Sequence, residues 1–401
     1  MSRTRLGVAL AALALVSACG TSSTAGSSGA GNTYAGKTLQ LGAVVSKTGA
    51  GSVYGLQQVD GVQLAQDYIN SHGGVLGAQI AVDVVDDGSD KSQGAQQFQT
   101  EIQQKNVLGI IGPTLSNTAV AAHPVANNLK TPVIAPSNTG INIVGSCPYA
   151  CDYIFRDSLG EESAIPANVK QAIGAHHPKA PVLFYVNDDK FSSDGHTIFL
   201  KSFQSDGVAI PDANVFGFSK NDPCCESVVT SALAKSPDIV SISSLGAIPA
   251  KLIHELRKQG YKGTILGGNG FNTYQVSQQA GSDGLGAQSG SAYYVGIDTQ
   301  INKDFVAAYQ AKFGQKPDQI AAQAYAAVFI FAEAAKKANL ELSSSSLAAD
   351  RTKLRDALKS VSVNTPFGQF SFTATHDVKQ TIYVVAMDGS GGFSLVSTVQ
   401  P

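Results

Sequence analysis

The stretch from Asn106 to Gly140, NVLGIIGPTLSNTAVAAHPVANNLKTPVIAPSNTG, decides the fold of this chain. Its apolar, β-branched run Val107–Ile111 is short enough for a buried strand, and Gly112-Pro113 ends that strand. The residue spacing in Ala119–Leu129 predicts a helix, and Pro132–Ala135 predicts a second strand. The stretch is therefore predicted to form a strand–helix–strand unit.

Both predicted strands end in loops that carry hydroxyl and amide side chains. In an open α/β sheet, ligands bind beyond the carboxyl ends of the strands, so the two loops would face one crevice. The plain alternative for a single loop is that such residues are only helix caps and turn formers. Two loops at neighbouring strand ends favour a shared ligand site instead. Its candidate residues are Thr114, Ser116, Asn117, Thr118, Ser137, Asn138 and Thr139.

The composition is that of a globular protein. The chain has 401 residues, enough for two domains with substantial cores, and only 14% of them are charged. Its 41 glycines suit a compact, loop-rich α/β protein rather than a disordered chain. The net charge of −2 and the lack of any Lys/Arg run leave no basic field, so we expect no nucleic-acid partner.

Residues 1–18 have the pattern of an export signal. Arg3 and Arg5 form a positive region, and Leu6–Val16 is an apolar run too short to span a bilayer. The following Val-Ser-Ala-Cys resembles a lipobox, the bacterial lipoprotein cleavage signal, which implies that Cys19 becomes the first mature residue and carries the lipid. The alternative is an ordinary secretory signal with an incidental cysteine. Residues 19–36 are predicted to be a flexible tether.

Four further cysteines are candidates for disulfide bonds, because an exported location favours oxidation. Cys147 and Cys151 would close a small loop, whereas Cys224 and Cys225 would form a strained vicinal pair. Four cysteines allow three pairings, so the crosswise alternatives stay open. Their spacing does not suggest a metal site, and we expect a structural role for all four.

Motifs for catalysis and cofactor binding are missing or out of place. The seven histidines are scattered, and the chain has neither HExxH nor a GxSxG on a strand–helix turn. Residues Gly31–Thr38 match the phosphate loop GxxxxGK(S/T), but they precede the first strand instead of following one. We therefore predict no catalytic residue, no metal and no cofactor.

A second series of strands and helices follows residue 156 and repeats the first. It contains strands at Pro181–Val186, Ile239–Ile242 and Thr264–Leu266 that are separated by helical segments. A third segment ends in two alternating strands of hairpin type. This order of elements predicts an α/β protein with two doubly wound, Rossmann-like lobes.

Several segments resemble type I periplasmic binding proteins, in particular the leucine/isoleucine/valine-binding branch of ABC importers. The match covers the chain from about Lys37 to its C-terminus. The segments that carry the resemblance are Asp60-Gly61, Gly73–Gly77, Ile110–Pro113, Thr131–Thr139 and Phe155-Arg156.

The resemblance implies two lobes that close on a ligand about a three-segment hinge. The chain would cross between the lobes near Arg156, Ser289 and Thr365. Lobe 1 would then comprise residues 37–156 and 289–365. Lobe 2 would comprise residues 157–288 and 366–401.

The resemblance also implies binding-site positions. Tyr54 matches an aromatic residue in the first turn, and Phe191 falls near the aromatic of the second lobe. Ser116, the backbone at Ser137 and the Thr139 side chain match groups that hold the ligand carboxylate in family members that bind amino acids. The complete set of predicted ligand-binding residues is Tyr54, Ser116, Asn117, Ser137, Asn138, Thr139, Phe191, Leu245 and Asn269.

Two positions depart from the family pattern. The acidic residue that meets the ligand's α-ammonium group is replaced by Asn269, and its companion tyrosine is replaced by Leu245. A neutral amide gives up most of a charge-assisted interaction, which is worth roughly 1.5–3 kcal/mol. Unless Glu161 or Asp188 supplies the charge, an amino acid should bind poorly, whereas a carboxylate or small polar head group still fits. The alternative is an alignment shifted by a residue or two.

These observations predict an exported, monomeric solute-binding lipoprotein that is anchored through Cys19 to the outer face of the cytoplasmic membrane. It would bind a small polar or carboxylate-bearing metabolite, such as an amino acid, an amide or an organic acid, and deliver it to an ABC permease. The alternatives are a sensory component for amides or amino acids and an exported enzyme. A neighbouring gene for a permease or a kinase would distinguish the first two roles, and turnover of substrates would reveal the third.

Overall fold

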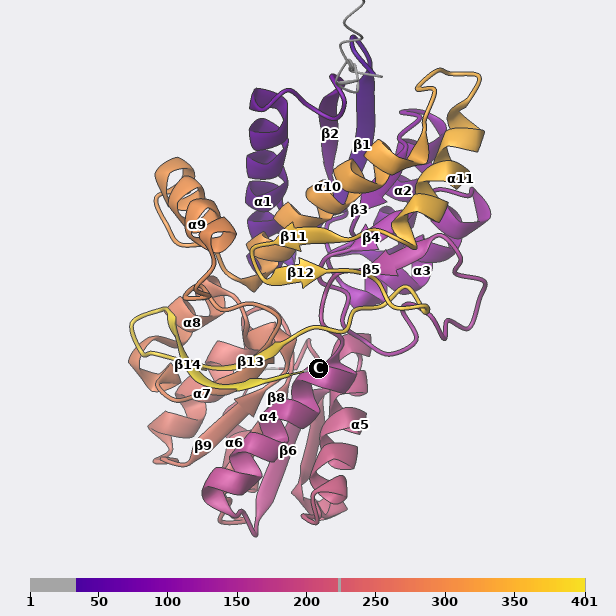
Figure 1. Cartoon of the computed structure of the whole chain (residues 1–401). Helices are drawn as coiled ribbons and strands as arrows, with labels where there is room; N and C mark the ends of the chain where they lie inside the picture. The colour runs from indigo at the N-terminus through magenta and orange to yellow at the C-terminus, as the bar shows by residue number, and fades with distance from the viewer. Residues whose placement is uncertain (1–33, 223–224, 401) are drawn as a thin grey trace, which may run out of the picture.

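The computed structural model describes residues 34–222 and 225–400, which form two α/β lobes stacked on each other (Figure 1). The predicted signal peptide, most of the tether, Cys19 and Cys224 lie outside the described residues. Each lobe contains a mainly parallel sheet covered by helices.

The sheet of lobe 1 has five parallel strands in the order β2-β1-β3-β4-β5. Continuous apolar runs form its inner strands because helices bury both faces of the sheet, and every residue of β3 and β4 is buried. The strands are β1 (Thr38–Val45), β2 (Gln79–Asp86), β3 (Gly109–Ile111), β4 (Val133–Ala135) and β5 (Ile154–Arg156).

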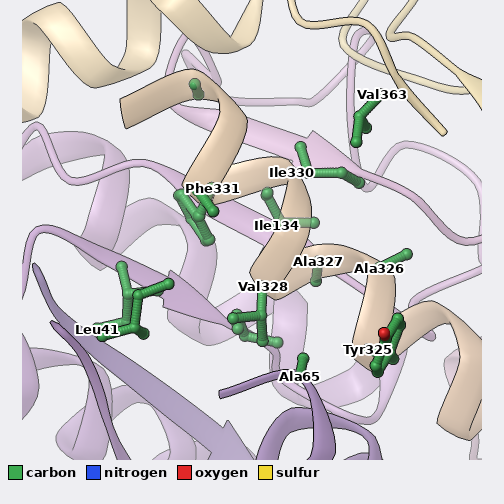
Figure 2. Close-up of a cluster of buried hydrophobic side chains, with 14 of the residues drawn as sticks. Leu41, Ala65, Ile134, Tyr325, Ala326, Ala327, Val328, Ile330, Phe331 and Val363 are labelled. Atoms are coloured by element: carbon green, nitrogen blue, oxygen red, sulfur yellow. The ribbon is translucent and has the colours of Figure 1, made fainter. Parts of the chain in front are cut away.

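Helix α10 fills the core of lobe 1. Figure 2 shows Val328 and Phe331 of α10 among buried side chains that include Leu41 of β1 and Ile134 of β4. Helices α2 and α3 enclose a second apolar cluster with the same strands. No helix of the described residues is both long and apolar enough to cross a membrane. The lobe 1 helices are α1 (Ser52–Ser71), α2 (Lys91–Gln103), α3 (Ser116–Asn128), α9 (Gln300–Phe313), α10 (Gln319–Ala338) and α11 (Leu347–Leu358).

The sheet of lobe 2 has seven strands in the order β14-β13-β10-β9-β8-β6-β7. The five strands from β10 to β7 are parallel, whereas β13 and β14 extend the sheet as an antiparallel hairpin. The strands are β6 (Pro181–Val186), β7 (Val215–Phe218), β8 (Ile239–Ser243), β9 (Thr264–Gly267), β10 (Gln288–Ser291), β13 (Ile382–Met387) and β14 (Phe393–Val399).

The helices of lobe 2 connect its parallel strands, as the predicted doubly wound fold requires. The α-helices are α4 (Glu161–His176), α5 (Lys190–Ser205), α6 (Glu226–Leu233), α7 (Ile248–Lys258) and α8 (Tyr274–Ala280). Three short 3-10 helices are η1 (Asp212–Asn214), η2 (Asn269–Phe271) and η3 (Gly281–Gly284).

The second and third crossings between the lobes come later in the chain than the predicted boundaries. Ser289 lies inside β10, which pairs with β9 and β13 of lobe 2, so the chain leaves this lobe after Ser291. Thr365 ends β11 (Val363–Thr365), which pairs with β12 (Gly368–Phe370), and Phe372 belongs to the lobe 1 core. The third crossing therefore lies between Phe372 and β13.

The first and third crossings are tied together by Arg156. Its guanidinium forms an ion pair with Asp377 and donates to the carbonyl oxygens of Asn138 (3.2 Å) and Gly140 (3.1 Å). The Arg156 N–H also donates to the carbonyl of His376 (3.0 Å). These contacts fix the hinge strands relative to the loop after β4.

The structure shows one of the two predicted local disulfides. Cys147 and Cys151 form a disulfide that closes the small loop before β5. Cys224 lies outside the described residues, so the pairing of Cys224 with Cys225 stays a prediction.

Candidate functional site

A cavity lies between the lobes, beyond the carboxyl ends of strands in both sheets. It contains about 350 Å³ of space not filled by protein atoms, including its opening. The loops after β3, β4, β8 and β9 and the first turns of α1, α5 and α10 form its walls. None of the lining side chains is charged. They are Tyr54, Thr114, Leu115, Ser116, Ser137, Thr139, Phe191, Leu245, Asn269, Gly270, Gln319 and Ile320.

Seven of the nine predicted ligand-binding residues line this cavity, because β3 and β4 end side by side as predicted. Gly112 allows β3 to end so close to β1. Its φ is +126°, and a Cβ there would lie 2.1 Å from the carbonyl oxygen of Val44, so only glycine fits. The seven residues are Tyr54, Ser116, Ser137, Thr139, Phe191, Leu245 and Asn269.

Asn117 and Asn138 do not line the cavity and differ from the prediction in this respect. Asn138 is fully buried, and its Nδ2 donates to the carbonyl of Pro113 (2.6 Å), so it ties the two strand-end loops together. Asn117 Nδ2 donates to Asp189 Oδ2 (2.7 Å), and the Lys190 N–H donates to Asn117 Oδ1 (2.8 Å). Asn117 therefore joins lobe 1 to lobe 2 outside the cavity.

A buried chain of polar groups supports the lobe 1 wall. Gln58 Nε2 donates to Ser137 Oγ (2.8 Å), and Thr114 Oγ1 donates to Gln58 Oε1 (2.5 Å). The Ser46 N–H donates to Thr114 Oγ1 (2.8 Å), and Ser46 Oγ donates to Asp87 Oδ1 (2.7 Å). The Ser137 and Thr114 hydroxyls are thus held in place by the protein itself.

Thr139 and the start of α3 leave hydrogen-bonding groups free on the same wall. Thr139 Oγ1 is buried and has no partner among the described residues. The N-cap residue of α3 is Leu115, which provides no side-chain bond to the first turn that starts at Ser116. The first N–H groups of a helix are unpaired within it and carry partial positive charge. This wall therefore suits a carboxylate or carbonyl oxygen.

The lobe 2 wall holds Asn269 with both ends of its amide engaged. Asn269 Nδ2 donates to the carbonyl of Leu159 (2.9 Å), and Gln319 Nε2 donates to Asn269 Oδ1 (2.9 Å). The Asn269 N–H donates to Glu161 Oε1 (2.7 Å). An aspartate here would place a carboxylate against a carbonyl oxygen and beside Glu161, so this wall is built for the neutral amide.

Neither acid suggested as a substitute lines the cavity. Glu161 is fully buried beside Asn269, and this burial raises the pKa of Glu161 to about 8, so its carboxyl is mainly protonated at neutral pH. Asp188 is exposed and accepts hydrogen bonds from Ser219 Oγ (2.9 Å) and the Lys220 N–H (2.9 Å). The cavity therefore offers no carboxylate to a ligand ammonium group.

Tyr54 connects the two lobes at the cavity. Its hydroxyl donates to the carbonyl of Gly270 (2.9 Å) and accepts from the Gly246 N–H (3.1 Å). Tyr54 belongs to the first turn of α1 in lobe 1, whereas Gly246 lies in the loop after β8 and Gly270 lies in η2, both in lobe 2. The structure therefore shows the lobes closed on each other.

Comparison with known proteins identifies the family. The model of the family described as periplasmic binding protein matches residues 38–392. The chain belongs to the periplasmic binding protein family. This membership confirms the resemblance seen in the sequence and implies a location outside the cytoplasm.

One curated relative of this periplasmic binding protein is the leucine-, isoleucine-, valine-, threonine- and alanine-binding protein of Pseudomonas aeruginosa. The two are 23% identical over 354 residues, which cover 88% of this chain and 90% of the relative. A Leu/Ile/Val-binding protein of Rhizobium johnstonii is 22% identical and covers 85% of this chain and 89% of its own length.

Solved structures confirm the predicted type I fold. The branched-chain amino acid transporter substrate-binding protein of Streptococcus pneumoniae, in complex with isoleucine, aligns with a TM-score of 0.81 and 26% identity, covering 91% of this chain and all of its own. A solute-binding protein of an ABC transporter from R. palustris, in complex with benzoate, aligns with a TM-score of 0.80 and 22% identity. That alignment covers 91% of this chain and 97% of the other.

Four lining residues of this periplasmic binding protein were not predicted, whereas Thr114 was a candidate from its strand-end loop. Leu115 lies in the same strand-end loop as Thr114 and Ser116, so the loop itself was the available signal. Gly270 follows Asn269. Gln319 and Ile320 open α10 after the second crossing, and only the folded arrangement brings them to the cavity. The remaining candidates from the strand-end loops, Asn117, Thr118 and Asn138, do not line it.

Proposed function

We propose that this periplasmic binding protein is the solute-binding component of an ABC importer and that its ligand is a small carboxylate or amide without an ammonium group. The observation that carries the proposal is the uncharged cavity, whose lobe 1 wall offers free hydrogen-bonding groups and whose lining also includes apolar side chains from both lobes. The role is binding and release, with no bond made or broken.

The ligand head group would lie against Thr139, Ser116 and the first turn of α3. Thr139 Oγ1 lacks a partner, and the helix start offers free N–H groups, so a carboxylate there gains charge-assisted hydrogen bonds. Structural neighbours in complex with isoleucine and benzoate support this head group, because both compounds carry a carboxylate.

The rest of the ligand would lie against apolar side chains of the lining such as Phe191, Leu245 and Ile320. An α-ammonium group in this position would lose its hydration without meeting a carboxylate, which is costly in a buried site. The carboxylate Asp189 nearby already caps α5 and accepts from Asn117. We therefore expect amino acids to bind more weakly than the matching carboxylates.

Closure of the lobes would couple binding to transport. A ligand that contacts both walls favours the closed form over the open one, and a permease could read that difference. The export signal and the lipobox at Cys19 support anchoring near such a permease. Delivery to the permease and the lipid anchor are parts of the proposal.

A thermal-shift comparison of 4-methylpentanoate, 4-methylpentanamide and leucine tests the ligand class, since the first and last differ only in the ammonium group. A ligand at about 100 times its dissociation constant stabilises the protein by roughly 2.7 kcal/mol. We expect the acid or the amide to stabilise the protein and leucine to have little effect. A larger shift with leucine would show that an acid reaches the ammonium and would overturn the proposed class.

The variant Thr139→Val checks the placement of the head group, because valine keeps the shape and removes the free hydroxyl. It should weaken binding of the carboxylate, whereas Thr197→Val on the exposed face of α5 should not. If both variants bind like the parent protein, the carboxylate does not lie where we propose.

A further inference from the structure

A second cavity lies on lobe 1, away from the interlobe site, between α1, α9, α10 and the turn after β11. It contains about 700 Å³ of unfilled space including its mouth, about twice that of the interlobe cavity. No residue is shared between the two linings. The lining residues that bear on a ligand are Tyr68, Ile301, Asp304, Phe305, Tyr325 and Phe329.

Four aromatic rings dominate its walls. The ring centroids of Phe305 and Tyr325 are 4.6 Å apart, and those of Tyr325 and Phe329 are 4.7 Å apart. The ring centroids of Tyr68 and Phe329 are 5.7 Å apart, and Tyr68 is 45% exposed, so its ring forms part of the mouth of the cavity. Ile301 is also 40% exposed there. The aromatic faces are held rigidly by one another, which makes a preformed surface for a ligand.

No side chain that lines this cavity carries a positive charge. Asp304 is the one charged side chain in the lining, and its Oδ1 accepts from Gln300 Nε2 (2.8 Å). The hydroxyls of Tyr68 and Tyr325 have no hydrogen-bond partner within residues 34–222 and 225–400. The nearby Lys303 is paired with Asp298 (2.6 Å) and does not line the cavity.

We propose that this cavity binds a small organic ammonium ion at a site separate from the interlobe one. The electronegative faces of the rings that line the cavity attract a cation, and the apolar walls accept its hydrocarbon part. One face of Tyr68 is stacked on His72, with ring centroids 4.1 Å apart, so Tyr68 can offer only its other face. The carboxylate of Asp304 at the mouth supplies the opposite charge. A carboxylate ligand would meet Asp304 and the ring faces unfavourably, so the two cavities select opposite head groups.

Calorimetric titration of the purified protein with benzylammonium and with benzyl alcohol tests the charge selection. The two probes share the ring and differ in the head group, so burial of the ring alone would favour both equally. We expect benzylammonium to bind and benzyl alcohol to bind clearly more weakly. Equal binding of both compounds, or no binding of benzylammonium, would overturn the proposal.

Variants locate the site. Asp304→Asn should weaken benzylammonium binding about fivefold, as expected for a partly exposed ion pair. Asp298→Asn removes the same charge from an 87% exposed neighbour outside the lining and is the matched control. Tyr68→Ala, at the exposed mouth, should also weaken binding. If Asp298→Asn reduces the affinity for benzylammonium as much as Asp304→Asn does, the loss reflects the overall negative charge of the surface, and benzylammonium does not bind in this cavity.

A final control separates this site from the proposed function. Thr139→Val alters only the interlobe cavity, so it should leave benzylammonium binding unchanged. Loss of benzylammonium binding in this variant would place the ammonium ion between the lobes and overturn the second site. Failure of 4-methylpentanoate to bind has no bearing on the result.

Discussion

The hydroxyl of Tyr54 should control how far the lobes stay closed, and Tyr54→Phe removes that group alone. In the closed structure the hydroxyl bonds to Gly270 O and Gly246 N, and both glycines are buried. In an open form water can satisfy all three groups. The variant therefore destabilises the closed form selectively and leaves the fold of each lobe intact.

The size of the effect follows from the two lost hydrogen bonds. Each contributes about 1 kcal/mol net, so closure should lose about 2 kcal/mol. Because 1.4 kcal/mol corresponds to a factor of ten, the apparent affinity for a ligand that binds the closed form should fall by up to roughly 30-fold.

Small-angle X-ray scattering of the unliganded protein and titration with 4-methylpentanoate measure the two consequences. We expect Tyr54→Phe to show a larger radius of gyration and weaker binding. Tyr68→Phe is the matched control, since Tyr68 lies on the same helix and its hydroxyl has no partner among the described residues. Scattering and affinity unchanged from the parent protein, or equal effects of both variants, would refute this reasoning.

Three further predictions concern the stability of other parts of the structure. Burial raises the pKa of Glu161 from 4.5 to about 8, so the folded state holds a proton that the unfolded state releases, and stability should fall as pH rises through this range. Glu161→Gln should flatten that fall in urea unfolding measured across pH, and an unchanged slope would contradict it. Gly61→Ala should cost about 1–3 kcal/mol of stability, because its Cβ would lie 2.3 Å from the carbonyl of Ala321, whereas Gly174→Ala, with open space, should be neutral or stabilising. Arg156→Met should lower the melting temperature, because it removes the ion pair with Asp377 and the hydrogen bonds to two buried carbonyls, and an unchanged melting temperature would show that the hinge contacts are dispensable.

The arrangement of strands could be predicted from sequence because it depends on local patterns. Apolar β-branched runs such as Val107–Ile111 and Pro181–Val186 mark buried strands, and their order with helices fixes a doubly wound fold. The lobe boundaries were harder to predict from the sequence. Ser289 lies in a short strand whose lobe depends on its pairing with β13, far along the chain, whereas Thr365 lies in a short local hairpin with β12, and composition does not change at either position.

The residues that line the cavity were predictable where they lie in the loops directly after a predicted strand. Ser116, Ser137 and Thr139 follow directly from strand ends, and the cavity contains all three. Asn117 was misplaced because the predicted helix began at Ala119, whereas α3 begins at Ser116. A helix that starts three residues earlier turns Asn117 out of the loop and toward the other lobe, where it meets Asp189.

The contacts that close the lobes explain how a modest ligand can control them. Many are neutral hydrogen bonds, such as Tyr54 to Gly270 and Gln319 to Asn269, which water replaces when the lobes separate. Closure also brings Val53 and Leu115 of lobe 1 into the apolar cluster of lobe 2. Opening would expose these two apolar side chains to water, which opposes separation of the lobes. Closure alone gives no hydrogen-bond partner to the hydroxyl of Thr139 or to the uncapped start of α3. A carboxylate can satisfy these lobe 1 groups in either form, so its preference for the closed form must come from the contacts that the rest of the ligand makes with lobe 2, and those contacts set how far it shifts the equilibrium.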